Sequence, residues 1–196
     1  MDSEEALVRL VAGNHRFERG ESIHPHESID WRRHVADDHP PLATILGCSD
    51  AHAPPEILFD QGLGDLFVIR VAGNVISADT LASVLYAGAY WGTRLFVVLG
   101  HEGCGVVKAA LEEKARHARQ PGQIETLVQL ILPALQDIDP AATPPRQLEA
   151  AVEANVRWSV AQITQMRAAQ KAVQQKRVRI VGAIYEVQSG RVRFLD

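Results

Sequence analysis

Residues 95–105 read LFVVLGHEGCG, and this stretch decides the fold. The apolar run at residues 95–99 is short and continuous, which is typical of a strand buried on both faces of a parallel sheet. It ends in Gly100-His101, and a helical pattern of apolar residues follows at residues 106–119. A strand followed at once by a helix is the unit from which parallel α/β sheets are built.

The rest of the chain repeats this alternation. Further strands are predicted at residues 42–46, 66–70, 178–185 and 192–195, with helices between them at residues 78–90, 124–135 and 148–170. The turn at Gln188-Ser189-Gly190 makes the last strand a short edge strand. The prediction is an α/β fold whose mostly parallel central sheet has about four parallel strands plus an antiparallel edge strand, flanked by helices.

The N-terminal region differs from this core. Asp2 or Ser3 can cap a first helix, whose apolar residues continue to Phe17. Residues 20–41 are polar and rich in proline and histidine, which indicates an arm that lies on a surface. With 196 residues the chain is predicted to form one domain, in which residues 1–41 form the helix and arm and residues 42–196 form the core.

Composition excludes several classes of protein. Hydrophobic residues make up 46% of the chain, which is too many for a disordered protein. The net charge of −4, without a basic block, argues against nucleic acid as a partner. No apolar run approaches the roughly 20 residues of a membrane helix. The acidic N-terminus does not resemble a secretory signal, so a cytoplasmic location is expected.

The two cysteines and one histidine lie where strands end. Cys48 follows the strand at residues 42–46, and His101 and Cys104 follow the strand at residues 95–99. Ligands of open α/β sheets bind outside the carboxyl ends of strands, so these side chains are expected to converge. Two thiolates and one imidazole suit Zn²⁺. From spacing alone, buried inert cysteines and a redox pair are alternatives to a zinc site.

Two signatures carry a resemblance to a known family. The first is Cys48-Ser49-Asp50-Ala51-His52 and the second is Gly100-His101-Glu102-Gly103-Cys104-Gly105. Together with the stretches at residues 13–17, 59–74, 155–157 and 180–185, they make the chain similar to the β-class carbonic anhydrases over nearly its whole length. The resemblance implies the fold of that family and one Zn²⁺ per chain, with Cys48, His101 and Cys104 as ligands.

The resemblance also implies an activity and an assembly. A zinc lyase of this family hydrates carbon dioxide reversibly to bicarbonate through a zinc-bound hydroxide. Asp50 stands at the position of an aspartate that accepts a hydrogen bond from the hydroxide. The family builds homodimers around an exchanged N-terminal arm, and these often pair into dimers of dimers, so the first helix and residues 20–41 are expected to pack on a partner.

The sequence departs from the family at two positions of the pocket. His52 replaces an arginine that normally pairs with the aspartate and keeps it off the metal. Since histidine lacks a permanent charge, Asp50 is expected to ligate zinc at least part of the time. His39 replaces a glutamine that reaches into a neighbouring subunit's pocket, and His39 and Gly105 are the predicted substrate-binding residues.

These departures keep two alternatives open. One is a related zinc hydrolase that acts on carbonyl sulfide or carbon disulfide, and the other is a catalytically impaired zinc-binding homologue. A regulatory bicarbonate site found in some members needs a tryptophan where this chain has Ile45, so none is expected here. Arg70 is then interpreted as a strand-end residue that pairs with a local carboxylate.

Overall fold

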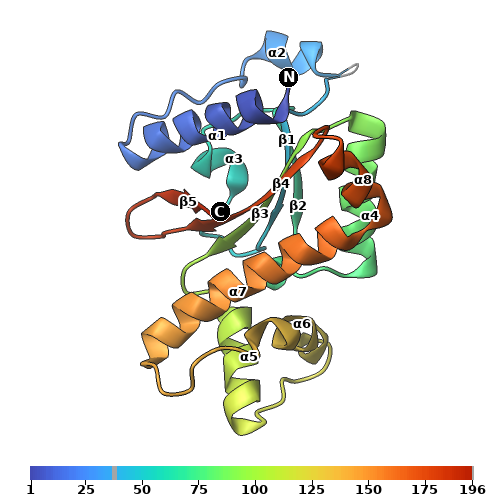
Figure 1. Ribbon diagram of the computed structural model, residues 1–196. Helices are drawn as coiled ribbons and strands as arrows, with labels where there is room; N and C mark the ends of the chain where they lie inside the picture. Colours follow the sequence, from blue (N-terminus) through green and yellow to red (C-terminus); the bar gives the residue numbers. More distant parts are fainter. Residues whose placement is uncertain (37–38, 196) are drawn as a thin grey trace.

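The computed structural model describes residues 1–36 and 39–195. Its centre is a five-stranded sheet in the order β2-β1-β3-β4-β5 (Figure 1). Neighbours are parallel except β5, which is antiparallel to β4. The sheet confirms the predicted fold class, and its strands are β1 (Ala43–Gly47), β2 (Leu66–Arg70), β3 (Leu95–His101), β4 (Arg179–Tyr185) and β5 (Val192–Phe194).

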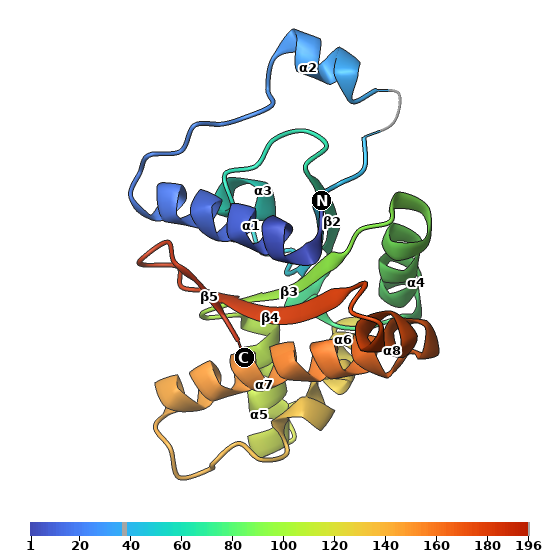
Figure 2. The same ribbon diagram turned by 45° about the horizontal axis from the view of Figure 1, so that its top comes forward.

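Helices cover both faces of the sheet. Helices α1 (Ser3–Glu18) and α3 (Pro55–Leu58) lie on one face (Figures 1 and 2). The other face is covered by α4 (Ala78–Tyr86), α5 (Gly105–Arg116), α6 (Ile124–Ile131) and α7 (Pro144–Gln165). The crossover through α3 leads from β1 to β2, and the crossover through α4 leads from β2 back past β1 to β3, so the chain order switches between β1 and β3.

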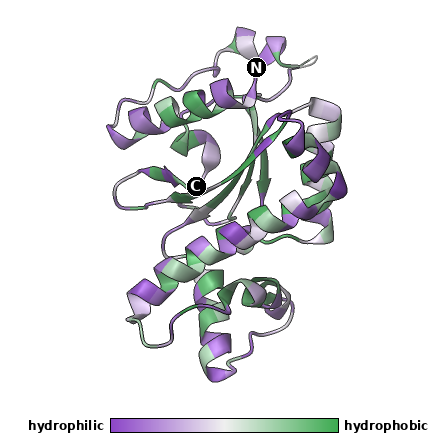
Figure 3. Ribbon diagram, in the orientation of Figure 1, coloured by the Kyte–Doolittle hydropathy of each residue, from purple (hydrophilic) through white to green (hydrophobic). Residues whose placement is uncertain are grey.

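Alternating side chains divide the core into two layers. Ile45 and Val97 face α1 and α3, whereas Leu46 and Val98 face the helices on the other side. Both layers are fully buried at the central strands, where all residues of β1 and β3 are buried. This explains the continuous apolar runs of the sequence, and Figure 3 shows the central strands largely in green, the colour of hydrophobic residues.

The helical boundaries differ from prediction in the C-terminal half. The helix predicted at residues 148–170 begins earlier, because Pro144 and Pro145 occupy its first turn, where no backbone N–H is needed. It also ends earlier, since Met166 adopts an extended conformation (ψ 132°) and a separate helix, α8 (Arg167–Gln174), follows. At residues 87–91, η2 (Ala87–Trp91) continues α4 as a π-helical turn.

The N-terminal helix packs on its own chain. Asp2 and Glu5 form the predicted capping box of α1. Leu10 is fully buried, and Asn14 donates hydrogen bonds to the carbonyls of Leu58 and Gly190 and accepts one from the backbone N–H of Val192. The apolar face of α1 is therefore buried against the α3 side of the core, and the packing of the first helix on a partner stays a prediction.

The arm contains one short helix, α2 (Ile29–His34), none of whose residues is buried. It is attached through Trp31, whose indole N–H donates to the Leu63 carbonyl at 2.8 Å and whose ring stacks on His26. In the described ranges, no helix combines the length and the apolar character that crossing a membrane requires.

Candidate metal centre

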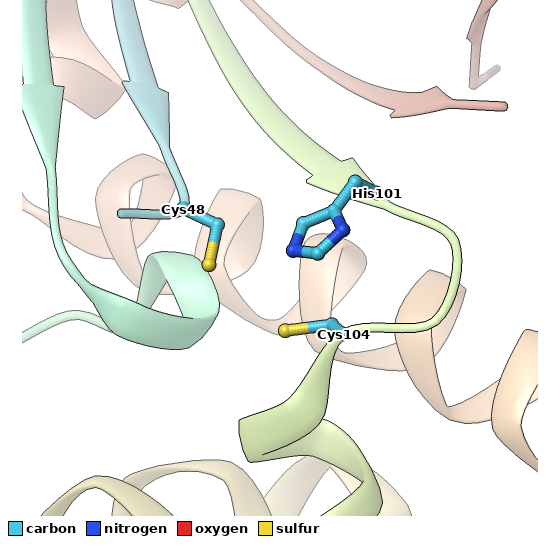
Figure 4. A group of neighbouring side chains, drawn as sticks. All are labelled: Cys48, His101 and Cys104. Carbon is cyan, nitrogen blue, oxygen red and sulfur yellow. The ribbon is translucent and has the colours of Figure 1, made fainter. Parts of the chain in front are cut away.

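The predicted ligands converge at the carboxyl ends of β1 and β3. Cys48 is the first residue after β1, His101 is the last residue of β3, and Cys104 immediately precedes α5. Figure 4 shows the three side chains pointing toward one another. The position is the switch point of the sheet, because the connection after β1 leads to β2 on one side and the connection after β3 leads to β4 on the other. Ligands of open α/β folds bind at such points.

The geometry of the three side chains suits one metal ion. All three residues are buried, and their ligand atoms lie within 4.8 Å of one another. Around tetrahedral zinc, sulfur and nitrogen ligands are separated by roughly 3.5–3.8 Å, so small side-chain movements would complete the site. No other cluster of this kind occurs in the part of the chain that the structure describes. The cysteines are free, which excludes a disulfide in this state.

His101 presents a specific nitrogen to the two cysteines. Its Nδ1 lies 3.0 Å from the carbonyl oxygen of Glu102, which fixes the proton on Nδ1 and leaves Nε2 as an acceptor. Nε2 is buried and has no hydrogen-bond partner within residues 1–36 and 39–195. A metal ion would satisfy this orphaned atom, and the Cys–His–Cys set is one that Zn²⁺ prefers.

Electrostatics favour a thiolate at Cys48. Interaction with the Cys104 thiol lowers the pKa of Cys48 to about 4, although burial opposes the change. Backbone N–H groups of Gly73 and Asp50 point at the Cys48 sulfur at 3.3 and 3.4 Å. The contact with Cys48, together with burial, raises the pKa of Cys104. A cation between the sulfurs would remove this asymmetry and stabilise both thiolates.

His101 carries the opposite tendency. Burial alone would lower its pKa, but the neighbouring Cys48 and the negative charge of Asp50 raise it. The raised pKa favours a second proton on the imidazole, at Nε2. A metal ion must displace this proton, because only neutral imidazole is a ligand.

Asp50 and His52 are in direct contact. The backbone N–H of His52 donates to Oδ1 of Asp50 at 2.9 Å, and Nδ1 of His52 lies 2.8 Å from the same oxygen. These hydrogen bonds lower the pKa of Asp50. The imidazole reaches the carboxylate although it carries no permanent charge, because the turn after β1 brings it within hydrogen-bonding distance.

The second oxygen of Asp50 faces the cluster. Oδ2 lies 4.0 Å from Nε2 of His101, whereas Asp50 is not among the residues whose ligand atoms form the compact group. Whether Asp50 also ligates the metal stays a prediction.

Arg70, at the end of β2, also belongs to the site, and its contacts there were not predicted from the sequence. Its guanidinium donates to the carbonyl oxygens of Cys48 at 3.0 Å and Asp50 at 2.5 Å. The interpretation that Arg70 pairs with a carboxylate is wrong, because its acceptors are two peptide carbonyls. The register of two strands separated by α3 creates this contact, and no local sequence signal reveals it.

The two predicted substrate-binding residues lie apart. Gly105 is exposed at the start of α5, next to Cys104, and open space surrounds its α-carbon. His39 precedes β1 and therefore lies at the opposite end of the sheet from the cysteines. Its ring contacts Trp31 edge-on, with centroids 5.2 Å apart, and it borders a groove of about 470 Å³ beside Leu66. Within one chain, His39 does not reach the cluster.

Comparison with known proteins identifies relatives of the whole fold. Residues 43–192 match the family model described as carbonic anhydrase. The chain is 30% identical over 194 residues to a carbonic anhydrase of Pseudomonas aeruginosa, with 95% of this chain and 86% of that protein covered. It is 42% identical over 130 residues to carbonic anhydrase 2 of Mycobacterium tuberculosis, with 66% of this chain covered. This match spans 63% of the length of the mycobacterial protein.

Solved structures share the architecture. A β-carbonic anhydrase of Aspergillus fumigatus is 25% identical and superposes with a TM-score of 0.73, covering 100% of this chain and 91% of the other. One of the β-carbonic anhydrases of Sordaria macrospora described as tetrameric superposes with a TM-score of 0.78 at 20% identity, covering 97% of each chain. The family match, the whole-length relative and the Cys48–His101–Cys104 cluster agree, and the chain belongs to the β-class carbonic anhydrase family.

Proposed function

We propose that this protein catalyses the reversible hydration of carbon dioxide to bicarbonate, as a zinc lyase of the carbonate dehydratase kind. The observation that carries the proposal is the convergence of Cys48, His101 and Cys104 at the switch point, with the carboxylate of Asp50 beside them. β-Carbonic anhydrases are zinc enzymes, and the cluster could bind a metal ion of that kind. When bound, zinc supplies a Lewis acid that makes hydroxide available near neutral pH.

The residues of this chain would divide the remaining work. Cys48, His101 and Cys104 hold the metal, and their burial prevents competing water from displacing them. Oδ1 of Asp50 is occupied by His52, so only Oδ2 is free to accept a hydrogen bond from the attacking water. An ionised carboxylate accepts but cannot donate, so it would orient that water with its lone pair toward the substrate carbon.

Access to the cluster fits a small substrate. The loop that carries Asp50 and His52 is partly exposed, with 32% and 77% of the two side chains accessible. Gly105 leaves open space next to Cys104. Carbon dioxide is small, linear and apolar, so it does not need a large cleft to approach the cluster past this partly exposed loop.

We also propose that the active protein is a homodimer or a dimer of dimers. The edge strand β2 pairs only with β1, and residues 66–69 are half-buried although apolar. Tyr86 and Tyr90 stack beside it with centroids 4.7 Å apart and are 45% and 77% exposed. Within the described residues the outer edge of β2 has no strand beside it, and such an edge flanked by exposed aromatic rings is typical of a surface that pairs with another chain. Such pairing would bring His39 to the boundary between subunits, where the predicted contribution to a partner's pocket becomes possible.

A parallel set of assays tests the function. Stopped-flow hydration of carbon dioxide is measured beside sulfide release from carbonyl sulfide and carbon disulfide, with zinc-loaded protein and with the Cys104→Ser variant as a blank. Zinc-dependent hydration that is lost in the variant supports the proposal. Sulfide release in its place supports the zinc hydrolase, and no turnover by zinc-loaded protein supports the impaired homologue. Either of the last two outcomes overturns the proposal.

A further inference from the structure

Arg70 lies next to the loop that carries both Cys48 and Asp50. It is the last residue of β2, and the parallel register pairs it with Gly47, the last residue of β1. The pairing continues one step beyond the strands, because the backbone N–H of Val71 donates to the Gly47 carbonyl at 3.1 Å. The arginine therefore emerges at a fixed position beside the chain that leaves β1.

The side chain of Arg70 holds two peptide groups of that loop. Nε donates to the carbonyl oxygen of Cys48 at 3.0 Å, and Nη2 donates to that of Asp50 at 2.5 Å. A guanidinium presents its donors in a rigid plane, so two bonds to carbonyls two residues apart restrict the peptide units between them. Within the described chain Arg70 forms no ion pair, so its donors are directed to the loop backbone.

His52 restrains the same aspartate from the other direction. Its backbone N–H and imidazole both contact Oδ1 of Asp50. Arg70 thus fixes the main chain of Asp50 and His52 fixes one side-chain oxygen, which leaves Oδ2 facing Nε2 of His101 at 4.0 Å. In this arrangement Asp50 lies outside the compact group of ligand atoms that Cys48, His101 and Cys104 form.

We propose that Arg70 is a positioning residue, which holds the loop so that Asp50 stands beside the metal site and not in the coordination sphere. This inference rests on the proposed function for its catalytic consequence, but its structural part concerns only Arg70, Asp50 and the metal. In the family that the chain resembles, an arginine at the position of His52 restrains the aspartate. The proposal assigns part of that restraint to Arg70, which lies on a different strand.

The test compares Arg70→Gln and Arg70→Lys with Arg94→Gln. Arg94 precedes β3 and is exposed at the opposite end of the sheet, so its substitution controls for loss of one surface charge. For Arg70→Gln we expect kcat of carbon dioxide hydration to fall at least tenfold, with zinc content still near one per chain. Lysine keeps the charge but provides a single donor centre, so Arg70→Lys is expected to fall between Gln and wild type.

A spectroscopic readout separates positioning from activity. Co²⁺-substituted protein reports its ligands through visible absorption bands, and Arg70→Gln is expected to change these bands as the Asp50 carboxylate enters the coordination sphere. In an Asp50→Asn background, Arg70→Gln should change neither the bands nor the residual kcat, because the group through which it acts is gone.

Each outcome decides the inference. Wild-type bands and kcat in Arg70→Gln would overturn it, and so would a loss that persists undiminished in the Asp50→Asn background, since that indicates a general structural role. If wild-type protein does not hydrate carbon dioxide, the proposed function fails, whereas a carboxylate-dependent change in the Co²⁺ bands on Arg70→Gln would still support the restraint by Arg70.

Discussion

The imidazole of His52 lies 2.8 Å from Oδ1 of Asp50, and the backbone N–H of His52 contacts the same oxygen at 2.9 Å. Two donors of His52 therefore hold one carboxylate oxygen of Asp50, a residue two positions earlier in the chain. The contact shows that His52 reaches the carboxylate, because the short turn brings its backbone N–H and its ring to the same oxygen. It changes what substitutions at this position are expected to do.

Removal of the His52 side chain should impair the site, whereas arginine should be tolerated. For His52→Ala we expect kcat of carbon dioxide hydration to fall about tenfold, equivalent to about 1.4 kcal/mol of barrier, because Oδ1 of Asp50 keeps only its backbone donor. For His52→Arg we expect a rate within about threefold of wild type, or about 0.7 kcal/mol. Stopped-flow rates of both variants check this, with His15→Ala at an exposed position of α1 as a control. A large gain in His52→Arg would show that histidine restrains Asp50 poorly.

The metal should contribute to stability through all three ligands. Cys104→Ser is expected to lose zinc and to melt at a lower temperature, since a ligand bound at 100 times its dissociation constant stabilises the fold by about 2.7 kcal/mol. Chelation should lower the Tm of wild-type protein to near that of the variant and leave the variant unchanged. Metal analysis and calorimetry measure these effects, with Ser49→Ala as the matched control because Ser49 is exposed beside Cys48. Stoichiometric zinc in Cys104→Ser would contradict the ligand assignment.

Asp60 should make the N-terminal region sensitive to acid. Its fully buried carboxylate accepts hydrogen bonds from Arg16 at 2.6 Å and from the backbone N–H groups of Ile23 and His24. Burial alone would raise the pKa of Asp60, but these donors lower it below its ordinary value of 3.8. A lowered pKa in the folded state stabilises the protein above the unfolded value, and this contribution is lost as pH falls through the folded value.

The corresponding variant is Asp60→Asn. At pH 7 we expect it to lose about 3 kcal/mol of unfolding free energy, because Arg16 then lacks its carboxylate. The difference from wild type should shrink as pH falls below about 3.8, where the carboxylate of the unfolded chain becomes protonated. Urea unfolding between pH 7 and pH 3 measures it, with exposed Asp79→Asn as the control. A difference that grows toward acidic pH would refute the assignment.

The edge of β2 should carry the contact between subunits. Tyr86→Glu combined with Tyr90→Glu is expected to raise the dimer dissociation constant at least 100-fold, or about 2.7 kcal/mol, because burying two carboxylates is costly. Light scattering and sedimentation measure the effect. Ile124→Glu is the control, since Ile124 is 48% exposed and belongs to α6, which lies below the sheet in Figure 1. An unchanged association state would place the interface elsewhere.

Much of the fold could be predicted because the strands are recognisable from their local sequence. The apolar runs that became β2 and β3 are continuous, and each is bounded by glycine or polar residues. The capping box of α1 could be predicted for the same reason, since it involves only Asp2 and Glu5. The break at Met166 could not, because no glycine or proline stands near it, and α7 packs against β3 and β4 while α8 packs on α7.

The sequence alone predicted that the three candidate ligands of the metal centre converge. Cys48, His101 and Cys104 directly follow or end their strands, and parallel strands place such residues at one edge whatever the detailed packing. Only the tertiary structure decided how Asp50 is held. Its partner His52 is two residues away, but their contact depends on the conformation of the turn, and Arg70 reaches the loop through strand pairing across 20 residues. Strand ends are set by local hydrophobic pattern, whereas hydrogen bonds between side chains and distant peptide groups depend on register, which exists only once the sheet has formed.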